Sequence, residues 1–169
     1  PGDDWQMEDD WDTRQPFLAC ALPRALLNTL LQVARDRELQ LIEIVPHFIA
    51  TWNRWRTELQ ANAWLGVAYE DRLTLGAITR QRLRAVRTIQ LSGDAWHNPR
   101  LLPEYLAREA LRLNLPIPDH LQLCGNVPGH WANQTMELLL CSRLDGIGSA
   151  LGHAPISAGM ALARTGMRT

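Results

Sequence analysis

Histidine, serine and aspartate are the side chains of this sequence that could move a proton or hold a metal, and their spacing argues against both. The five histidines show no His-x-His or His-x-x-x-His spacing, and none stands at zinc-ligand distance from a cysteine. Ser92, Asp94 and His97 collect the residue types of a catalytic triad within one loop. Side chains so close in sequence rarely meet in the nucleophile, base and orienter geometry. The sequence therefore predicts no catalytic residue and no metal site.

Arginines form the densest cluster of charge, at Arg80, Arg82, Arg84 and Arg87. The first three would share one face of an extended strand, because successive side chains of a strand alternate between its faces. Such a face could grip an acidic peptide or phosphate groups. The same charges would also protect a solvated edge strand from sticking to another strand. Arg80, Arg82 and Arg84 are therefore the candidate partner-binding residues, and the protective role stays open beside it.

Composition describes a folded chain with an uneven distribution of charge. Of its 169 residues, 46% are apolar and 21% are charged, which is the usual globular mixture. Six of the 18 acidic residues precede residue 13, whereas all 17 basic residues follow it and every one is arginine. The acidic residues 1–15 are expected to form a flexible tail. The mild basic excess of the remainder does not require a nucleic acid partner.

Two further features bear on where the chain works. Glycine and proline interrupt the longest uncharged run, Gly146 to Ala163, so we expect no direct membrane insertion. The three cysteines are odd in number, widely spaced and flanked by apolar residues, which favours buried thiols in a reducing compartment. A cytoplasmic location follows. Pro1 in place of methionine suggests a piece of a longer protein.

Hydrophobic periodicity and proline positions predict an α/β protein. The apolar pattern changes to period two near residue 61, where a hairpin and a third antiparallel strand are expected. The expected elements, in chain order, are a strand Phe17–Leu22, a helix from Pro23, a strand Leu39–Val45, a helix from Pro46, three strands between Ala61 and Leu91, a helix from Pro103 to Asn114, a strand Leu121–Cys124, a helix Asn133–Leu140 and a helix Ile156–Arg164.

Three antiparallel strands followed by alternating helices and strands are the lobe pattern of ribonuclease-H-like and actin-like proteins. Local sequence adds to this pattern. Ala21 to Leu27 and then Leu39 to Pro46 resemble the "small strand, Pro, Leu-rich helix, strand, Pro" segment of PilM-, MshI- and GspL-type proteins. Trp64 to Leu91 is similar to the start of their second lobe, and Ser157 to Ala163 to their terminal helix. The resemblance covers about residues 16–165.

The resemblance implies an actin-like (ASKHA) scaffold of type IV pilus or type II secretion assembly, peripheral to the bacterial inner membrane. Its partner would be a bitopic inner-membrane assembly protein with a short cytoplasmic segment, and a homodimer stays open. Residues 16–60 would be the βαβα end of lobe one, and residues 61–169 the ribonuclease-H-like lobe two. The chain would thus be a fragment covering late lobe one and lobe two.

The positions that would bind nucleotide in this family are degraded. Where an active member would read Asp-x-Gly-x-x-x-Thr, this chain keeps Gly66 but has neither the aspartate nor the threonine, and the adenosine-side Gly-Gly is Gly125-Asn126. The resemblance therefore implies a pseudo-ATPase without a cofactor. The alternative is a ribonuclease-H-like or ASKHA phosphoryl-transfer enzyme or ATPase, which needs convergent carboxylates for divalent metals. Only Glu70 stands at the edge of an expected central strand. An arginine-rich nucleic acid binder is a third, weaker alternative. Such a protein should have a basic strand with aromatic residues interleaved, which this chain lacks, and the acidic tail would oppose binding.

Overall fold

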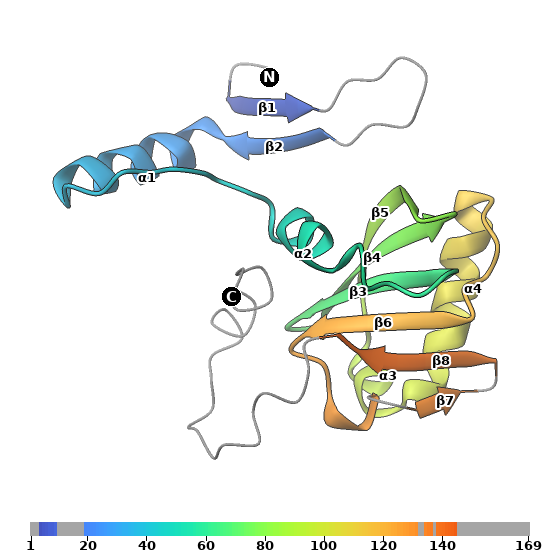
Figure 1. Ribbon diagram of the computed structural model, residues 1–169. Coiled ribbons are helices and arrows are strands. Elements are labelled where there is room, and N and C mark those ends of the chain that lie inside the picture. The colour runs from blue at the N-terminus through green and yellow to red at the C-terminus, as the bar shows by residue number, and fades with distance from the viewer. Residues whose placement is uncertain (1–3, 10–18, 132–133, 137, 145–169) are drawn as a thin grey trace. The chain divides into compact units, whose positions relative to one another are not determined.

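The computed structural model of the protein describes residues 4–9, 19–131, 134–136 and 138–144 (Figure 1). The chain divides into two compact units, Pro1–Pro46 and His47–Thr169. The boundary differs from the expected one after residue 60. The reason is that helix α2 (His47–Trp55) buries Phe48, Thr51 and Trp55, and its Phe48 and Trp55 pack with the core of the second unit.

Unit 1 contains a hairpin and one helix. Strand β1 (Trp5–Asp9) pairs antiparallel with β2 (Ala19–Pro23), and α1 (Arg24–Asp36) follows directly. Part of the expected acidic tail is therefore a strand. The helix expected from Pro23 begins one residue later, at Arg24, because Pro23 is the last residue of β2, and α1 ends where Glu38 takes a left-handed backbone with φ of 54°.

The expected strand Leu39–Val45 is irregular in the structure. Residues 39–46 form no helix or strand, and none of them takes part in the described strand pairings. An apolar run of strand type becomes a strand only when a neighbouring strand satisfies its N–H and C=O groups. The described residues supply no such neighbour to this segment.

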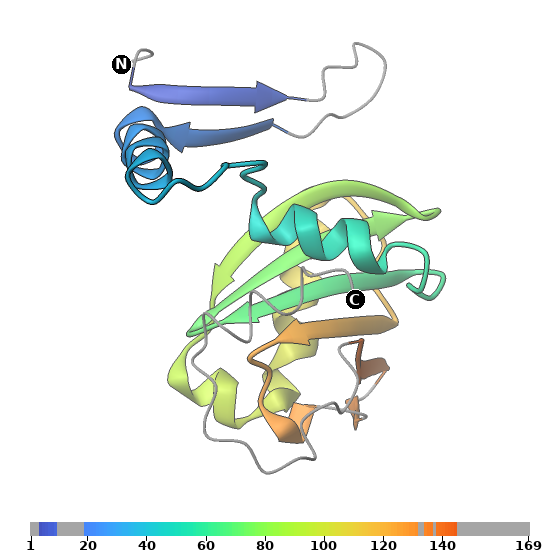
Figure 2. The ribbon, with the colours of Figure 1, turned by 60° about the vertical axis from the view of Figure 1, so that its left-hand side comes forward.

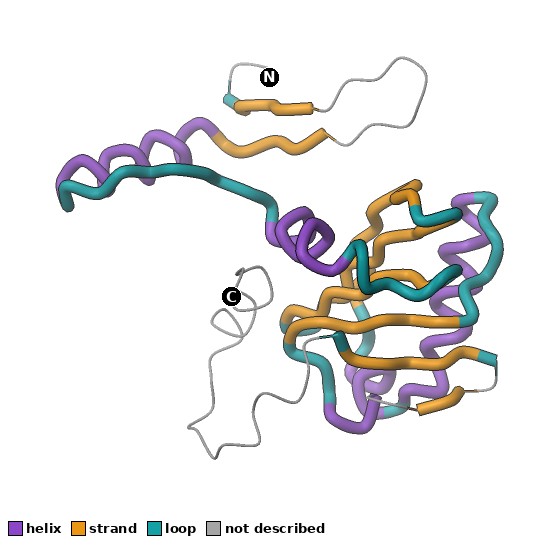
Figure 3. The backbone as a smooth tube through the Cα atoms, in the orientation of Figure 1, coloured by secondary structure: helices purple, strands orange, loops and turns teal. Residues whose placement is uncertain are grey.

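Unit 2 is built on a six-stranded mixed sheet with the order β5-β4-β3-β6-β8-β7 (Figures 1 and 3). Strands β3 (Ala63–Tyr69), β4 (Arg72–Thr79) and β5 (Arg82–Gln90) form an antiparallel meander. Strand β6 (His120–Gly125) lies parallel to β3 on its other side, and β8 (Leu139–Arg143) lies parallel to β6. The short β7 (Gln134–Met136) is antiparallel to β8. The three antiparallel strands were predicted correctly.

Alternation along the strands creates two cores, one on each face of the sheet. Figure 2 shows that helices cover both faces. Trp64 and Ala68 of β3 face helices α3 (Gly93–His97) and α4 (Leu102–Leu113), whereas Leu65 and Val67 face α2. Helix α4 follows the 3₁₀ turn η1 (Pro99–Leu101) and ends at Asn114, whose φ is 53°. The predicted helix from Pro103 to Asn114 is confirmed.

Two expectations for the second half were wrong. The expected helix Asn133–Leu140 is replaced by β7 and β8, which follow the 3₁₀ turn η2 (Gly129–Trp131). Leu139 and Cys141 are buried while Leu140 and Ser142 are half-buried, which is the period of a strand. The expected loop at Gly93 contains the one-turn helix α3. The expected helix Ile156–Arg164 lies outside the described residues.

Candidate functional site

The two glycines singled out by the sequence lie on neighbouring strands at the centre of the sheet. Gly66 of β3 is opposite Leu123 of β6, and Gly125 is opposite Ala68 two positions further along. In open α/β sheets, ligands bind beyond the carboxyl ends of parallel strands, where the strand order changes direction. Strands β3 and β6 meet at such a point, so the fold favours a ligand site at their carboxyl ends.

Gly66 has a packing role. A Cβ atom at this position would lie 2.8 Å from Cδ2 of Leu123, 3.2 Å from Cδ1 of Leu121 and 3.3 Å from Cδ1 of Leu73. The absence of a side chain thus lets three core leucines close over the sheet. The resemblance implied a degraded nucleotide-binding position at Gly66, whereas the nearest side chains are those of the three leucines.

Gly125 has a backbone role. Its φ of 89° favours glycine, and a Cβ atom would press directly against the carbonyl oxygen of Ala68. The same oxygen accepts a hydrogen bond of 3.1 Å from the N–H of Asn126. The chain therefore turns tightly over the end of β3 as it leaves β6.

Arg143, at the end of β8, holds the loop that follows Gly125. Its Nη2 donates to the carbonyl oxygen of Gly125 at 3.3 Å, and its Nη1 approaches that of Val127 at 3.5 Å. A guanidinium is suited to this position because it presents several N–H donors in one plane. Sequence reasoning missed Arg143, although a charged residue two positions after an apolar run was visible. The loop thus offers carbonyl oxygens to a protein cation.

The three candidate partner-binding arginines are all exposed at the tip of the β4–β5 hairpin, but they do not form one regular face. Arg80 lies in the two-residue turn with Gln81, and both have a left-handed backbone, with φ of 52° and 60°. Arg82 is the first residue of β5. Arg84 is the extra residue of a β-bulge, because Ile78 is opposite Leu83 while Ala77 is opposite Ala85. The bulge interrupts the alternation on which the shared face depended.

Arg87 is bound within the fold. Its Nε donates to Oε2 of Glu109 at 3.2 Å, and Nη1 of Arg112 donates to Oε1 of the same residue at 2.7 Å. The Glu109 side chain is only 3% exposed, whereas those of Arg87 and Arg112 are 48% and 57% exposed. This arrangement joins β5 to α4. Arg87 therefore holds the hairpin against the helix.

The candidate triad is a helix cap. The Ser92 hydroxyl accepts a hydrogen bond of 3.2 Å from the N–H of Ala95, and Nδ1 of His97 lies 2.6 Å from the carbonyl oxygen of Gly93. Both contacts close the single turn of α3. No group of three or more His, Cys, Asp or Glu side chains that could hold a metal occurs among the described residues.

The remaining titratable groups with shifted pKa values have simple causes. A hydrogen bond of 2.9 Å from Nδ1 of His120 lowers the pKa of the Asp119 carboxyl. Burial raises the pKa of the Cys141 thiol to about 12. Cys20 is exposed, contrary to the expectation of three buried thiols, while Cys124 and Cys141 are buried.

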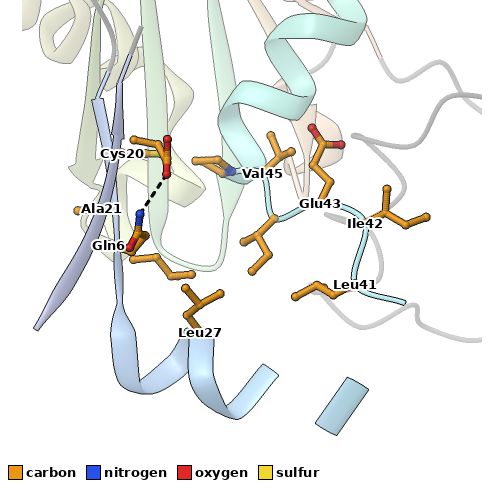
Figure 4. A pocket seen from close by; sticks show the side chains of 12 residues that line it. Gln6, Cys20, Ala21, Leu27, Leu41, Ile42, Glu43 and Val45 are labelled. Atoms are coloured by element: carbon orange, nitrogen blue, oxygen red, sulfur yellow. Dashed lines mark hydrogen bonds between the residues drawn. The ribbon is translucent and has the colours of Figure 1, made fainter. Parts of the chain in front are cut away.

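Unit 1 contains a cavity of about 550 Å³ that the sequence did not suggest (Figure 4). It lies against one side of the hairpin, where Gln6 is opposite Leu22 and Glu8 is opposite Cys20. Leu27 of α1 and residues 41–46 complete its lining, which is mostly apolar. Nε2 of Gln6 donates to Oε1 of Glu8 at 3.1 Å. The mostly apolar lining would suit an apolar side chain.

Membrane spanning by a helix is not supported in the described part of the chain, where no helix combines the necessary length and apolar character. No protein-family model and no curated protein matches the sequence. Among solved structures, the chain is similar to a Bacteroides thetaiotaomicron protein described as having an actin-like ATPase fold and unknown function. The superposition has a TM-score of 0.51 at 10% sequence identity and covers 77% of this chain and 49% of the other.

The chain thus spans about half the length of this structural neighbour. A likeness at 10% identity concerns the fold alone, since unrelated functions share the same fold. It confirms the predicted actin-like fold class without extending to the pilus and secretion proteins. The protein is a mixed α/β chain with an actin-like ATPase fold.

Proposed function

We propose that this chain is a non-catalytic, actin-like scaffold of a type IV pilus or type II secretion assembly. It would work in the cytoplasm, at the inner membrane, by binding a short segment of a bitopic membrane protein. The proposal combines the actin-like fold with the resemblance of residues 16–165 to PilM-, MshI- and GspL-type proteins. Recruitment by a partner is required by the proposal, because it places the chain at a membrane.

The loop after β6 is the observation that carries the non-catalytic part of the proposal. Gly125 and Val127 direct their carbonyl oxygens to Arg143. A nucleotide phosphate needs converging N–H donors, because two oxygen acceptors cannot hydrogen-bond to each other. Gly66 supports the same conclusion, since leucine side chains surround it. Both glycines thus have structural reasons to be present.

Calorimetry of the full chain with ATP and Mg²⁺ tests this part. We expect no binding in the micromolar range, and Mg²⁺ without ATP provides the baseline titration. A dissociation constant of 1 μM, which corresponds to about −8 kcal/mol, would reinstate the alternative of an ATPase or phosphoryl-transfer enzyme.

Capture from a native bacterial membrane extract tests the partner. The immobilised chain should retain a bitopic inner-membrane protein that mass spectrometry identifies, and added cytoplasmic segment of that protein should release it. A matrix carrying heat-denatured chain is the control. Retention of soluble proteins alone would remove the main support for a membrane assembly scaffold.

A further inference from the structure

Each sheet has two edge strands among the described residues, β1 and β2 in unit 1 and β5 and β7 in unit 2. β2 ends at Pro23 and β7 has only three residues, and proline and short length both protect an edge, so β1 and β5 are the edges better able to accept another strand. An unpaired edge exposes a row of N–H and C=O groups that another strand can bind. β1 has five residues and β5 has nine, so β5 is long enough to pair with all of β1.

These two edges carry opposite charge. The β1 segment contains Asp4, Glu8 and Asp9, all exposed. No acidic residue occurs between Arg72 and Asp94, the stretch that forms the β4–β5 hairpin. At the tip of that hairpin, the side chains of Arg80 and Arg84 make no ion pair or hydrogen bond with any described residue.

Charge therefore selects among the ways in which these edges could pair. Two β5 edges would combine two strands that carry only positive charge, and two β1 edges would combine two strands that carry only negative charge, so both like pairings are disfavoured. Pairing of β1 with β5 brings opposite charges together. Of the pairings between β1 and β5 edges, charge thus favours only the unlike one.

The backbone at the hairpin tip departs from the usual hairpin pattern in two places, and each of them carries an arginine. A two-residue hairpin turn with left-handed backbone is best formed by Asn-Gly, yet this turn consists of Arg80 and Gln81. The bulge at Arg84 is a second irregularity four residues later, and bulges redirect the side chains they contain. Two local deviations thus occur within the same basic tip.

We propose that β1 of one copy of this chain adds to the outer edge of β5 in a second copy. Main-chain hydrogen bonds would join the strands, and the carboxylates of Asp4, Glu8 and Asp9 would lie beside the arginine tip. The two surfaces in this contact differ, so each bound copy still presents a free edge and association grows with concentration unless a ring closes. This inference is independent of the proposed function, and its test needs no partner protein.

The first experiment measures the mass of the full chain by light scattering under reducing conditions, which prevent disulfide formation through Cys20. At about 50 mM salt we expect species heavier than the 19.1 kDa chain, and at about 500 mM salt a return toward that mass, since salt screens exposed charges. A synthetic peptide of residues 3–12 should compete and dissociate the oligomers. The same peptide with Asn and Gln in place of Asp and Glu should not.

The second experiment exchanges the charges. The double variants Arg80→Glu/Arg84→Glu and Glu8→Arg/Asp9→Arg should each associate at least about tenfold more weakly than the natural chain. Their equimolar mixture should associate again, because acidic β5 edges then meet basic β1 edges. The variant Arg56→Glu/Arg100→Glu, with the same change in net charge at two other exposed arginines, is the matched control and should associate normally.

Three results would overturn the proposal. The first is a natural chain that remains at 19.1 kDa at low salt and high concentration. The second is an oligomer that the charge-exchange variants and the control affect equally. The third is a change in stability of the exchange variants without any change in mass, which would assign the strand contact to a single chain. None of these results bears on capture of a membrane partner.

Discussion

Glu109 is the one charged side chain that is buried among the described residues. Its two oxygens bind Arg87 and Arg112, so the carboxylate is compensated while both guanidinium groups remain accessible to water. Removing a partner from a buried ion pair is costly because the remaining charge is left uncompensated. The loss of stability should therefore depend on whether the two arginines or Glu109 are removed.

We predict that Arg87→Met/Arg112→Met lowers the free energy of unfolding by about 3 kcal/mol. Adding Glu109→Leu to that variant should restore most of the loss, because no buried charge then remains. Urea denaturation followed by circular dichroism measures both changes. A triple variant less stable than the double variant would show that Glu109 contributes something other than charge compensation.

The thiols should differ in reactivity. Because burial raises the pKa of Cys141 to about 12, its thiol stays protonated at pH 8, where only about one molecule in ten thousand would carry the reactive thiolate. Cys20 is exposed, and Cys124 is buried. We expect iodoacetamide at pH 8 to add one group per folded chain, at Cys20, as measured by peptide mass spectrometry. The Cys20→Ser variant should remain unlabelled, and labelling of Cys141 in it would contradict the burial of that thiol.

At the scale of elements, the β4–β5 turn is the clearest site of backbone strain. Gln81 has φ of 60°, a conformation that costs a residue with a side chain about 1–2 kcal/mol. We predict that Gln81→Gly raises the free energy of unfolding by about 1 kcal/mol, since glycine relieves the strain but gains entropy in the unfolded chain. Gln81→Ala removes the same polar group while keeping Cβ, and it should give no gain. Equal stabilisation by both variants would show that the polar side chain, and not the backbone, is unfavourable.

The elements that the sequence predicted are those whose signals are local. The period-two pattern of β3 to β5 and the Pro103 and Asn114 boundaries of α4 do not depend on distant residues. The strand predicted at Leu39–Val45 is absent, because a segment with a strand pattern forms a strand only when a neighbouring strand pairs with it. The helix predicted at Asn133–Leu140 was wrong, because the pattern of a short apolar segment fits both a helix and a strand.

The candidate site shows the same division. Gly66 and Gly125 were identified as special positions from the sequence, but their neighbours Leu123 and Ala68 come from a strand pairing that local patterns do not encode. The prediction that three arginines share one strand face was wrong, because a β-bulge leaves no clear signal in the sequence. Arg143 was missed because its partners, Val127 and Gly125, precede it by 16 and 18 residues. The sequence therefore identified the special positions, whereas it did not predict the contacts that give these residues their roles.

At the scale of the whole molecule, the two units differ in how they are stabilised. Unit 2 buries two cores, with Leu121, Leu123 and Cys124 of β6 fully inaccessible. Unit 1 has no buried residue among those described. Its exposed large apolar side chains are Trp5, Met7, Leu26, Leu30, Val33, Leu39, Leu41, Ile42 and Ile44. Local stability should follow this difference.

Hydrogen exchange measures that difference directly. A helix of 13 residues is marginal in water without tertiary packing, so the amides of α1 should open locally without unfolding of the sheet. We predict that α1 amides exchange at least about a hundredfold faster than those of β6 at pH 7, which corresponds to about 2.7 kcal/mol less protection. About 500 mM salt keeps copies apart if the β1–β5 contact forms. Protection of α1 equal to that of β6 under these conditions would mean that its apolar side chains are covered, and that unit 1 is not held by its hairpin and helix alone.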